Sequence, residues 1–293
     1  MSFNLSLLQP YTQENTDLLS EAVLNTAELK YVAIRTGVPA ATSTINVFSG
    51  TITEQDRDCD MANVGSLTFD QIDVTVEDKA VAQNLCPTDL REYWMSERMK
   101  PGAVGGEEVP FEITIVDYVA KSVQKNISDF IGARLIASIT VALGAQDSGQ
   151  TVVSTVATIL DDLNDLYDAL DERVRLMDDV VIFMSPAYYR MAVRAIVAAG
   201  DTGFFHYNAG NGTGDVYLPG TNALLVQSSG FVGLDTFVAF PSKYAIFCTG
   251  LMSDSETINM IYDNINDRVA MRAYYRRGLS VYSVDQCATN GTL

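Results

Sequence analysis

The feature that most constrains the fold of this chain is a long run of apolar residues at helical spacing. Apolar side chains recur every three or four positions: Val116, Val119, Val123, Ile127, Phe130, Ile131, Leu135 and Ile139. A helix over about 111–143 would be roughly 50 Å long at 1.5 Å per residue. Pro110 lies near its start, where proline is tolerated, and Gly132 is its weakest point. A helix of this length indicates an elongated spine.

A second pattern, over residues 43–80, predicts a long β-hairpin. Apolar residues alternate with polar ones on both sides of a polar tip, as in half-exposed strands. Between residues 51 and 78 the hairpin carries eight acidic residues and one basic residue: Glu54, Asp56, Asp58, Asp60, Asp70, Asp73, Glu77, Asp78 and Arg57. Neither this hairpin nor the arm over residues 1–40 can bury enough apolar surface alone. Both must lie on the rest of the chain or on a neighbour.

The remaining elements are shorter. A capped helix is expected from Thr88 to the stop signal at Lys100-Pro101-Gly102, and an amphipathic helix over about 151–172. A buried strand at 180–184 runs into a helix that begins at Ser185-Pro186 and ends at Gly200. Further strands are expected at 224–226, 236–240, 245–247, 258–262 and 269–283. Helices and strands of this order predict an α+β fold.

Charge and composition exclude several classes of function. The chain of 293 residues has 19 basic and 37 acidic residues, a net charge of −18. Such acidity argues against binding to nucleic acid or to an anionic membrane. There is no signal peptide and no apolar stretch of about 20 residues, so the protein is expected to stay in the cytosol that makes it. The four cysteines, Cys59, Cys86, Cys248 and Cys287, are expected to be free thiols.

Motifs that could carry chemistry fail on context. Asp56, Asp58 and Asp60 resemble the start of a calcium loop, but the positions that need Gly and Glu hold Met61 and Leu67. The glycine-rich stretch 210–215 follows no strong strand and opens no helix, so a phosphate-binding loop is not expected. The single histidine, His206, lacks a nucleophile or orienting acid at a recognisable spacing.

One acidic helix leaves an enzyme open as a minor alternative. Its carboxylates could bind a metal, although a solvated helix face is the favoured reading of this set: Asp161, Asp162, Asp165 and Asp168. No catalytic, cofactor-binding or metal-binding residues are therefore expected, and the protein is expected not to be an enzyme.

The order of elements resembles that of the major capsid proteins of tailed bacteriophages, the Hong Kong ninety-seven type fold. Local stretches are similar to capsid proteins of crAss-like phages and their smaller relatives. They are Leu67–Gln71 with its continuation to Leu90, Phe205–Asn208, Leu218–Asn222 and Arg272–Ser280. The resemblance covers the chain from about 30 to 287.

The resemblance implies a division into parts. Residues 1–41 would be an N-terminal arm and 42–80 the extended loop that lies over an adjacent subunit. Residues 81–184 would form the peripheral domain, with the spine helix at about 111–143. Residues 185–250 would form the axial domain at the five- and six-fold centres. Residues 251–293 would return to the peripheral domain and complete the chain.

The function implied is that of a self-assembling shell subunit. It would form pentamers and hexamers of an icosahedral capsid around a double-stranded DNA phage genome, without sequence-specific DNA binding and without a membrane. The chain would be made in the host bacterial cytoplasm and end in the virion. Partners would be a portal protein and, where used, scaffolding and decoration proteins. Since only about 40 residues precede the hairpin, any scaffold is expected to be a separate protein. An encapsulin-like shell with a protein cargo is the alternative.

Two residue-level expectations follow. The basic residues Arg268, Arg272 and Arg276 fall on one face of a strand, so they are expected to meet carboxylates of a neighbouring subunit or loop. The type member of the fold joins its subunits through a lysine of the extended loop. There is no lysine between Lys30 and Lys79, so no such bond is expected.

Overall fold

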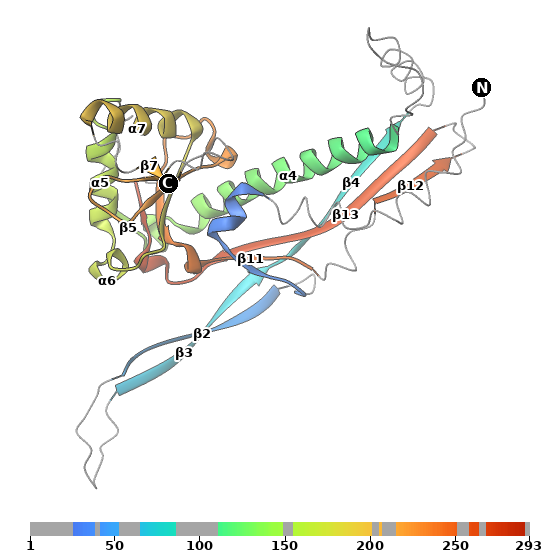
Figure 1. Cartoon of the computed structure of the whole chain (residues 1–293). Coiled ribbons are helices and arrows are strands. Elements are labelled where there is room, and N and C mark those ends of the chain that lie inside the picture. Colours follow the sequence, from blue (N-terminus) through green and yellow to red (C-terminus); the bar gives the residue numbers. More distant parts are fainter. Residues whose placement is uncertain are drawn as a thin grey trace.

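The computed structural model describes residues 26–38, 42–52, 65–85, 111–148, 155–200, 205–206, 215–250, 258–263 and 268–290. The arm up to residue 25, the hairpin tip, the expected helix from Thr88 to Lys100 and the stretch 210–214 lie outside this range. The described chain forms a spine helix on a long sheet, a projecting hairpin and a rounded body at one end of the spine (Figure 1).

The spine helix is confirmed, with a shorter C-terminal end. Helix α4 runs from Phe111 to Ser138, about 42 Å at 1.5 Å per residue. Thr140 is extended, and a 3-10 turn, η3 (Val141–Leu143), replaces the expected last turn before Gly144 at φ 102°. The predicted apolar stripe is buried at every position from Val119 to Ile139.

A five-stranded sheet runs along the spine. Its order is β1 (Ala33–Arg35), β11 (Ala245–Cys248), β13 (Arg268–Val281) and β12 (Ile258–Asp263), and β4 (Glu77–Leu85) also pairs with β13. Strand β13 is central: β11 pairs with its C-terminal end, and β4 pairs with it from Val269 to Arg277. Strand β4 is absent from the sequence prediction, which ended the extended loop at residue 80.

The predicted hairpin is present. Strands β2 (Thr42–Ile52) and β3 (Gly65–Thr75) pair antiparallel from Thr42↔Thr75 to Ile52↔Gly65. The strands form a separate two-stranded sheet that leaves the body at its lower side (Figure 1). At about 3.4 Å per residue the paired ribbon extends roughly 37 Å.

The rounded body is built on a seven-stranded mixed sheet. The strands are ordered β5 (Gln146–Asp147), β14 (Ala288–Thr289), β10 (Val238–Pro241), β6 (Val180–Met184), β9 (Leu224–Gln227), β8 (Asp215–Tyr217) and β7 (Phe205–His206). Helices α5 (Ile159–Ala169), α6 (Glu172–Arg175) and α7 (Pro186–Ala199) belong to the same body.

Several of these elements match their predictions. Strand β6 has the predicted bounds and is buried throughout. The Ser185 side chain accepts a hydrogen bond from the Tyr188 amide as the N-cap of α7, and Gly200 ends that helix at φ 83°. Helix α5 is shorter than predicted at both ends, but Ile159, Leu163 and Leu166 are buried as expected.

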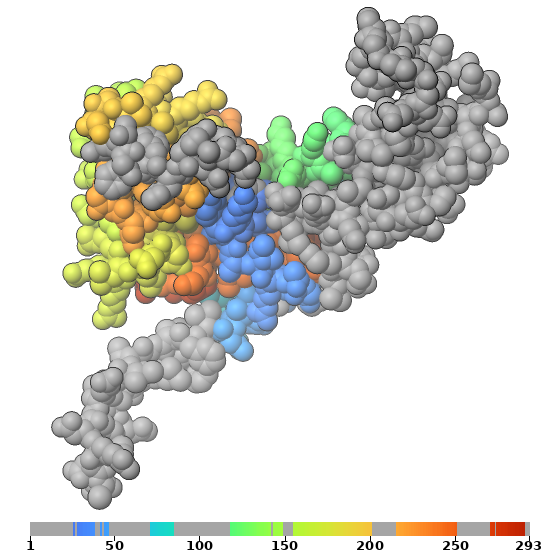
Figure 2. All heavy atoms as spheres, in the orientation of Figure 1, coloured from blue at the N-terminus to red at the C-terminus, as the bar shows by residue number. Residues whose placement is uncertain are grey.

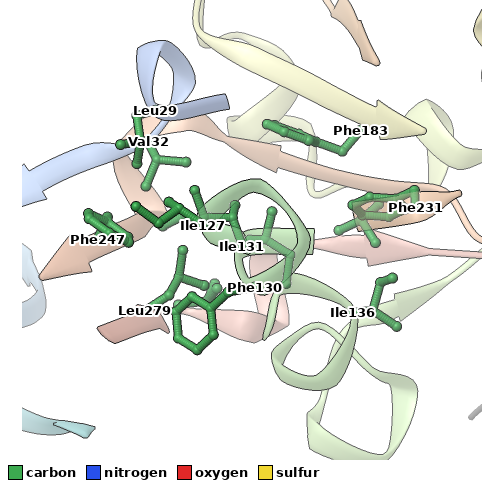
Figure 3. Packing of buried hydrophobic residues seen from close by; sticks show 14 of the residues in the cluster. Leu29, Val32, Ile127, Phe130, Ile131, Ile136, Phe183, Phe231, Phe247 and Leu279 are labelled. Carbon is green, nitrogen blue, oxygen red and sulfur yellow. The ribbon is translucent and has the colours of Figure 1, made fainter. Parts of the chain in front are cut away.

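Two apolar cores lie on opposite faces of the seven-stranded sheet. Because side chains alternate along β6, Val181 and Phe183 join the core around the spine helix, while Ile182 joins the core under α5 and α7. The first core also receives Phe231 and Phe247 (Figure 3). The predicted division at residue 184 passes between β6 and α7, which share the second core.

Candidate assembly surfaces

The base of the hairpin is fixed to the body by a small apolar cluster. Ile45, Val74 and Val76 pack with Val38 and Cys248, and the three hairpin residues are at most 8% exposed. Gly278 lies directly beneath, since a Cβ there would stand 2.8 Å from the Thr75 carbonyl oxygen. A side chain at this position of β13 would push the hairpin base away.

Charged residues hold the other side of the base. Glu77 accepts hydrogen bonds from Lys79 and Arg134 at 2.9 and 2.8 Å. The Lys79 hydrogen bond, helped by Arg134, holds the pKa of Glu77 below its ordinary value. Asp78 accepts from Nε of Arg276 at 2.6 Å. The point where β3 passes into β4 is therefore joined to both the spine helix and β13.

The basic residues of β13 match only part of the prediction made for them. Arg276 meets Asp78 of its own chain, within the stretch 42–80 predicted as the extended loop, so its partner is the expected loop and not a neighbouring subunit. The reason is the in-register pairing of Arg276 with Asp78 on β4, a strand that the sequence did not indicate. Arg272 pairs in register with Ala82 and is exposed. The side chain of Arg268 lies outside the described set.

The outer face of the β4–β13 ribbon is open in the single chain. On this face, exposed residues occupy alternate positions of both strands. Ala80 and Ala82 of β4 lie opposite Tyr274 and Arg272 of β13. Tyr274 is 46% exposed. The other face packs on α4, where the Arg277 guanidinium lies 4.3 Å from the Phe130 ring centroid and donates to the Asn126 carbonyl oxygen.

The described strands of the hairpin project away from the rest of the chain (Figure 1), and the outward side of their base is open. Thr44, Asn46, Gln71 and Asp73 are exposed, and the Gln71 amide donates to Asn46 Oδ1 at 3.1 Å across the strands. A two-stranded ribbon on its own is only marginally stable in water. The hairpin is thus suited to a contact with another molecule.

The end of the expected arm belongs to the core. A 3-10 helix, η2 (Ala27–Tyr31), buries Leu29 and leads through Val32 into β1. Figure 2 shows this segment in blue between the rounded body and the green spine helix. Glu28, 3% exposed, accepts hydrogen bonds from the Ser128 hydroxyl and from the Ser229 amide. The sequence held no signal for this buried carboxylate.

Among the described residues, the candidate carboxylates of α5 lie on an open helix face. Asp161, Asp165 and Asp168 are exposed on α5, as the solvated-face reading predicted. His206 lies on β7 in register with Asp215, outside the set with described side chains. In the described ranges, no three His, Cys, Asp or Glu residues come together as a metal site requires.

Two of the four cysteines can be placed. Cys248 and Cys287 are both free and buried, as expected. Cys59 and Cys86 lie outside the described residues. No helix in the described part of the chain has the length and apolar character of a membrane span.

No protein-family model and no curated protein matches the chain. Solved structures do. A chain of Gordonia phage Cozz is similar at a TM-score of 0.58 and 11% identity over 90% of this chain and 85% of that one. The capsid of cyanophage P-SCSP1u gives 0.51 at 11% identity, covering 88% and 85%. The SrpI encapsulin complex from Synechococcus elongatus gives 0.56 at 11% identity, covering 89% and 85%.

These likenesses extend over nearly the whole length of each chain. The chain therefore has the α+β fold of the Hong Kong ninety-seven type capsid proteins.

Proposed function

We propose that this protein is the major capsid protein of a tailed phage. Its copies assemble into the pentamers and hexamers of an icosahedral shell that encloses double-stranded DNA. The fold and its phage neighbours support the proposal. The protein acts as a structural subunit and not as an enzyme, and it ends in the virion after synthesis in the host cytoplasm.

The observation that carries the proposal is the unsupported hairpin. Its base is fixed by apolar and charged contacts, while Thr44, Asn46, Gln71 and Asp73 on the outward side of the base are exposed and the strands project from the body (Figure 1). Such a ribbon gains stability only against another molecule. In a shell of identical subunits each hairpin can lie on the next copy.

The parts of the chain take the roles that the resemblance implies, with one adjustment. Residues 1–41 act as the arm and 42–80 as the extended loop. The spine helix, β13 and the part of β4 from residue 81 onward form the peripheral domain within 81–184 and 251–293. Within 81–184, we assign α5, α6 and β6 to the axial domain 185–250, because they share its core.

An encapsulin-like shell is the second candidate, since an encapsulin complex is among the structural neighbours. The two shells differ in cargo, DNA against protein. A portal protein and, where used, scaffolding and decoration proteins belong to the phage proposal as partners.

The test is shortening of the hairpin. A variant that joins Asn46 to Gln71 through an Asn-Gly turn keeps Ile45, Val74 and the charged base. We expect it to fold, with a circular dichroism melt like that of the wild type, and to form no closed shells in electron micrographs. The wild type should form shells. Normal shells from the shortened variant would contradict the proposal, and protein cargo in wild-type shells would favour the encapsulin candidate.

A further inference from the structure

The rounded body carries two exposed stripes of opposite charge. The acidic stripe follows α5, where Asp161, Asp165 and Asp168 recur at helical spacing and are all exposed. The basic stripe follows α7, where Arg190 and Arg194 are exposed one turn apart. In a chain of net charge −18, two neighbouring arginines on one outer face stand out from their surroundings.

Each stripe brings like charges close together on one helix. Like charges four residues apart on a helix repel each other. The acids also continue toward the C-terminal end of α5, where the helix dipole disfavours them and no basic residue lies in the last turn. Arg175 forms an ion pair of 3.2 Å with Asp168, at the C-terminal end of this stripe.

The two stripes do not neutralise each other within the copy. Helices α5 and α7 pack through their buried sides, which include Leu163 and Ala192. Figures 1 and 2 show α7 across the top of the body and α5 down its left side, so their outer faces look in different directions. Within the described residues, neither Arg190 nor Arg194 forms an ion pair.

We propose that the basic stripe of one copy docks on the acidic stripe of the next copy. The spacing fits: Arg190 and Arg194 are separated by the same helical rise, about 6 Å, as Asp161 and Asp165, so two antiparallel or parallel helices can pair them one to one. Val197, 54% exposed one turn beyond Arg194, becomes covered at such a contact.

The contact joins two different patches, so it is head-to-tail and repeats from copy to copy until a ring closes. The inference rests on the proposed shell function and adds the residues that hold adjacent subunits of one ring together. The partner is a second copy of this chain, recognised by charge.

Charge reversal tests the contact. Arg190→Glu/Arg194→Glu makes both stripes acidic, and Asp161→Arg/Asp165→Arg makes both basic. Each should lower the assembled fraction by at least about tenfold, since like charges then face each other across the contact. The variant with all four changes restores complementarity and the wild-type net charge, and it should assemble again.

Two controls separate this effect from others. Lys121→Glu/Lys125→Glu on α4 changes the net charge by the same amount at exposed positions of the same spacing, and it should assemble better than the α7 reversal. Melting curves of the soluble variants establish that they fold. If a reversal does not fold, Arg190→Gln/Arg194→Gln takes its place, with a smaller loss expected.

Mixing the two reversed variants gives the sharpest result. Neither pairs with itself, but they pair with each other, so rings must alternate the two kinds of subunit. Six-membered rings can alternate and five-membered rings cannot. Native mass spectrometry should therefore find even-numbered rings, and micrographs should find no closed shells.

The outcomes distinguish the two proposals. Absence of shells from the wild type would refute the shell function. Wild-type shells with normal assembly of both reversals, or a folded four-change variant that does not assemble, would overturn the charge contact alone. A mixture that stops at dimers would show a two-fold contact, which also overturns the head-to-tail arrangement.

Discussion

At the scale of single residues, Tyr188 shows how burial changes acid–base behaviour. Its side chain is 5% exposed, and its hydroxyl donates to Asp235 Oδ1 at 2.7 Å. The ring stands edge-on to Phe237 with centroids 5.1 Å apart. Burial, followed by the hydrogen bond to Asp235, raises the pKa of Tyr188 from 10.0 to about 12.

This pKa predicts a loss of stability in alkali. As pH rises, the unfolded chain releases the Tyr188 proton first, so the stabilisation is complete below pH 10 and is lost as pH rises to about 12. The loss amounts to at most about 3 kcal/mol. Urea unfolding of wild type and Tyr188→Phe at several pH values checks this. The variant should lose less stability over this range, whereas the exposed-site control Tyr118→Phe should behave as the wild type.

A second residue-scale prediction concerns Cys287. Burial raises the pKa of this thiol to about 12, so almost no thiolate is present at pH 8. Iodoacetamide should leave Cys287 unmodified in the folded protein and modify it after unfolding in urea, as read by peptide mass spectrometry. Rapid modification of Cys287 in the native protein would show that the body opens around β14.

At the scale of elements, the spine helix touches η5 (Ser229–Phe231) backbone to backbone. A Cβ on Gly132 would stand 2.5 Å from the Gly230 Cα, and a Cβ on Gly230 would stand 2.6 Å from the Gly132 Cα. The Ser229 hydroxyl donates to Asp129 beside this crossing. Glycine lowers the helix propensity at position 132, but a larger residue would not fit at this close crossing.

Gly132→Ala should therefore destabilise the protein although alanine is the better helix former. We expect a net loss of about 1–3 kcal/mol, because overpacking outweighs a propensity gain of about 1 kcal/mol. Urea unfolding measures it. Asn126→Ala, at an exposed position of the same helix, carries the propensity gain alone and should be neutral or slightly stabilising. A stabilised Gly132→Ala would refute the close crossing.

Local patterns and long-range contacts differed in how well the sequence predicted them. The start of α4, the bounds of β6 and both caps of α7 were predictable because period, cap residue and glycine all act within one element. Strand β4 was not, because exposed Ala80, Ala82 and Asn84 show no strand-like alternation and the strand exists through its pairing with β13. The burial of Glu28, within the stretch predicted as an arm, was not predictable either, since its partners on α4 and η5 are distant in sequence.

At the scale of the whole molecule, the shell should be held without covalent links through the hairpin. No lysine occurs between Lys30 and Lys79, and arginine stays protonated and cannot replace a lysine nucleophile. Mature particles boiled in detergent with reductant should give a single band near 31.9 kDa. A ladder that survives reductant would contradict this prediction and the assignment of 42–80 as the extended loop.

The charged base of the hairpin has a mechanical consequence. In a ribbon of roughly 37 Å that turns as one piece, a rotation of about 10° at Val76 displaces the far end by about 6 Å, which is more than the spacing of two strands, about 4.8 Å. The ion pairs of Glu77 and Asp78, with Arg134 and Arg276, lie at the base about which such a rotation would take place. In the proposed shell, these side chains therefore set how accurately the far end of the hairpin is placed on the next copy, a full ribbon length away.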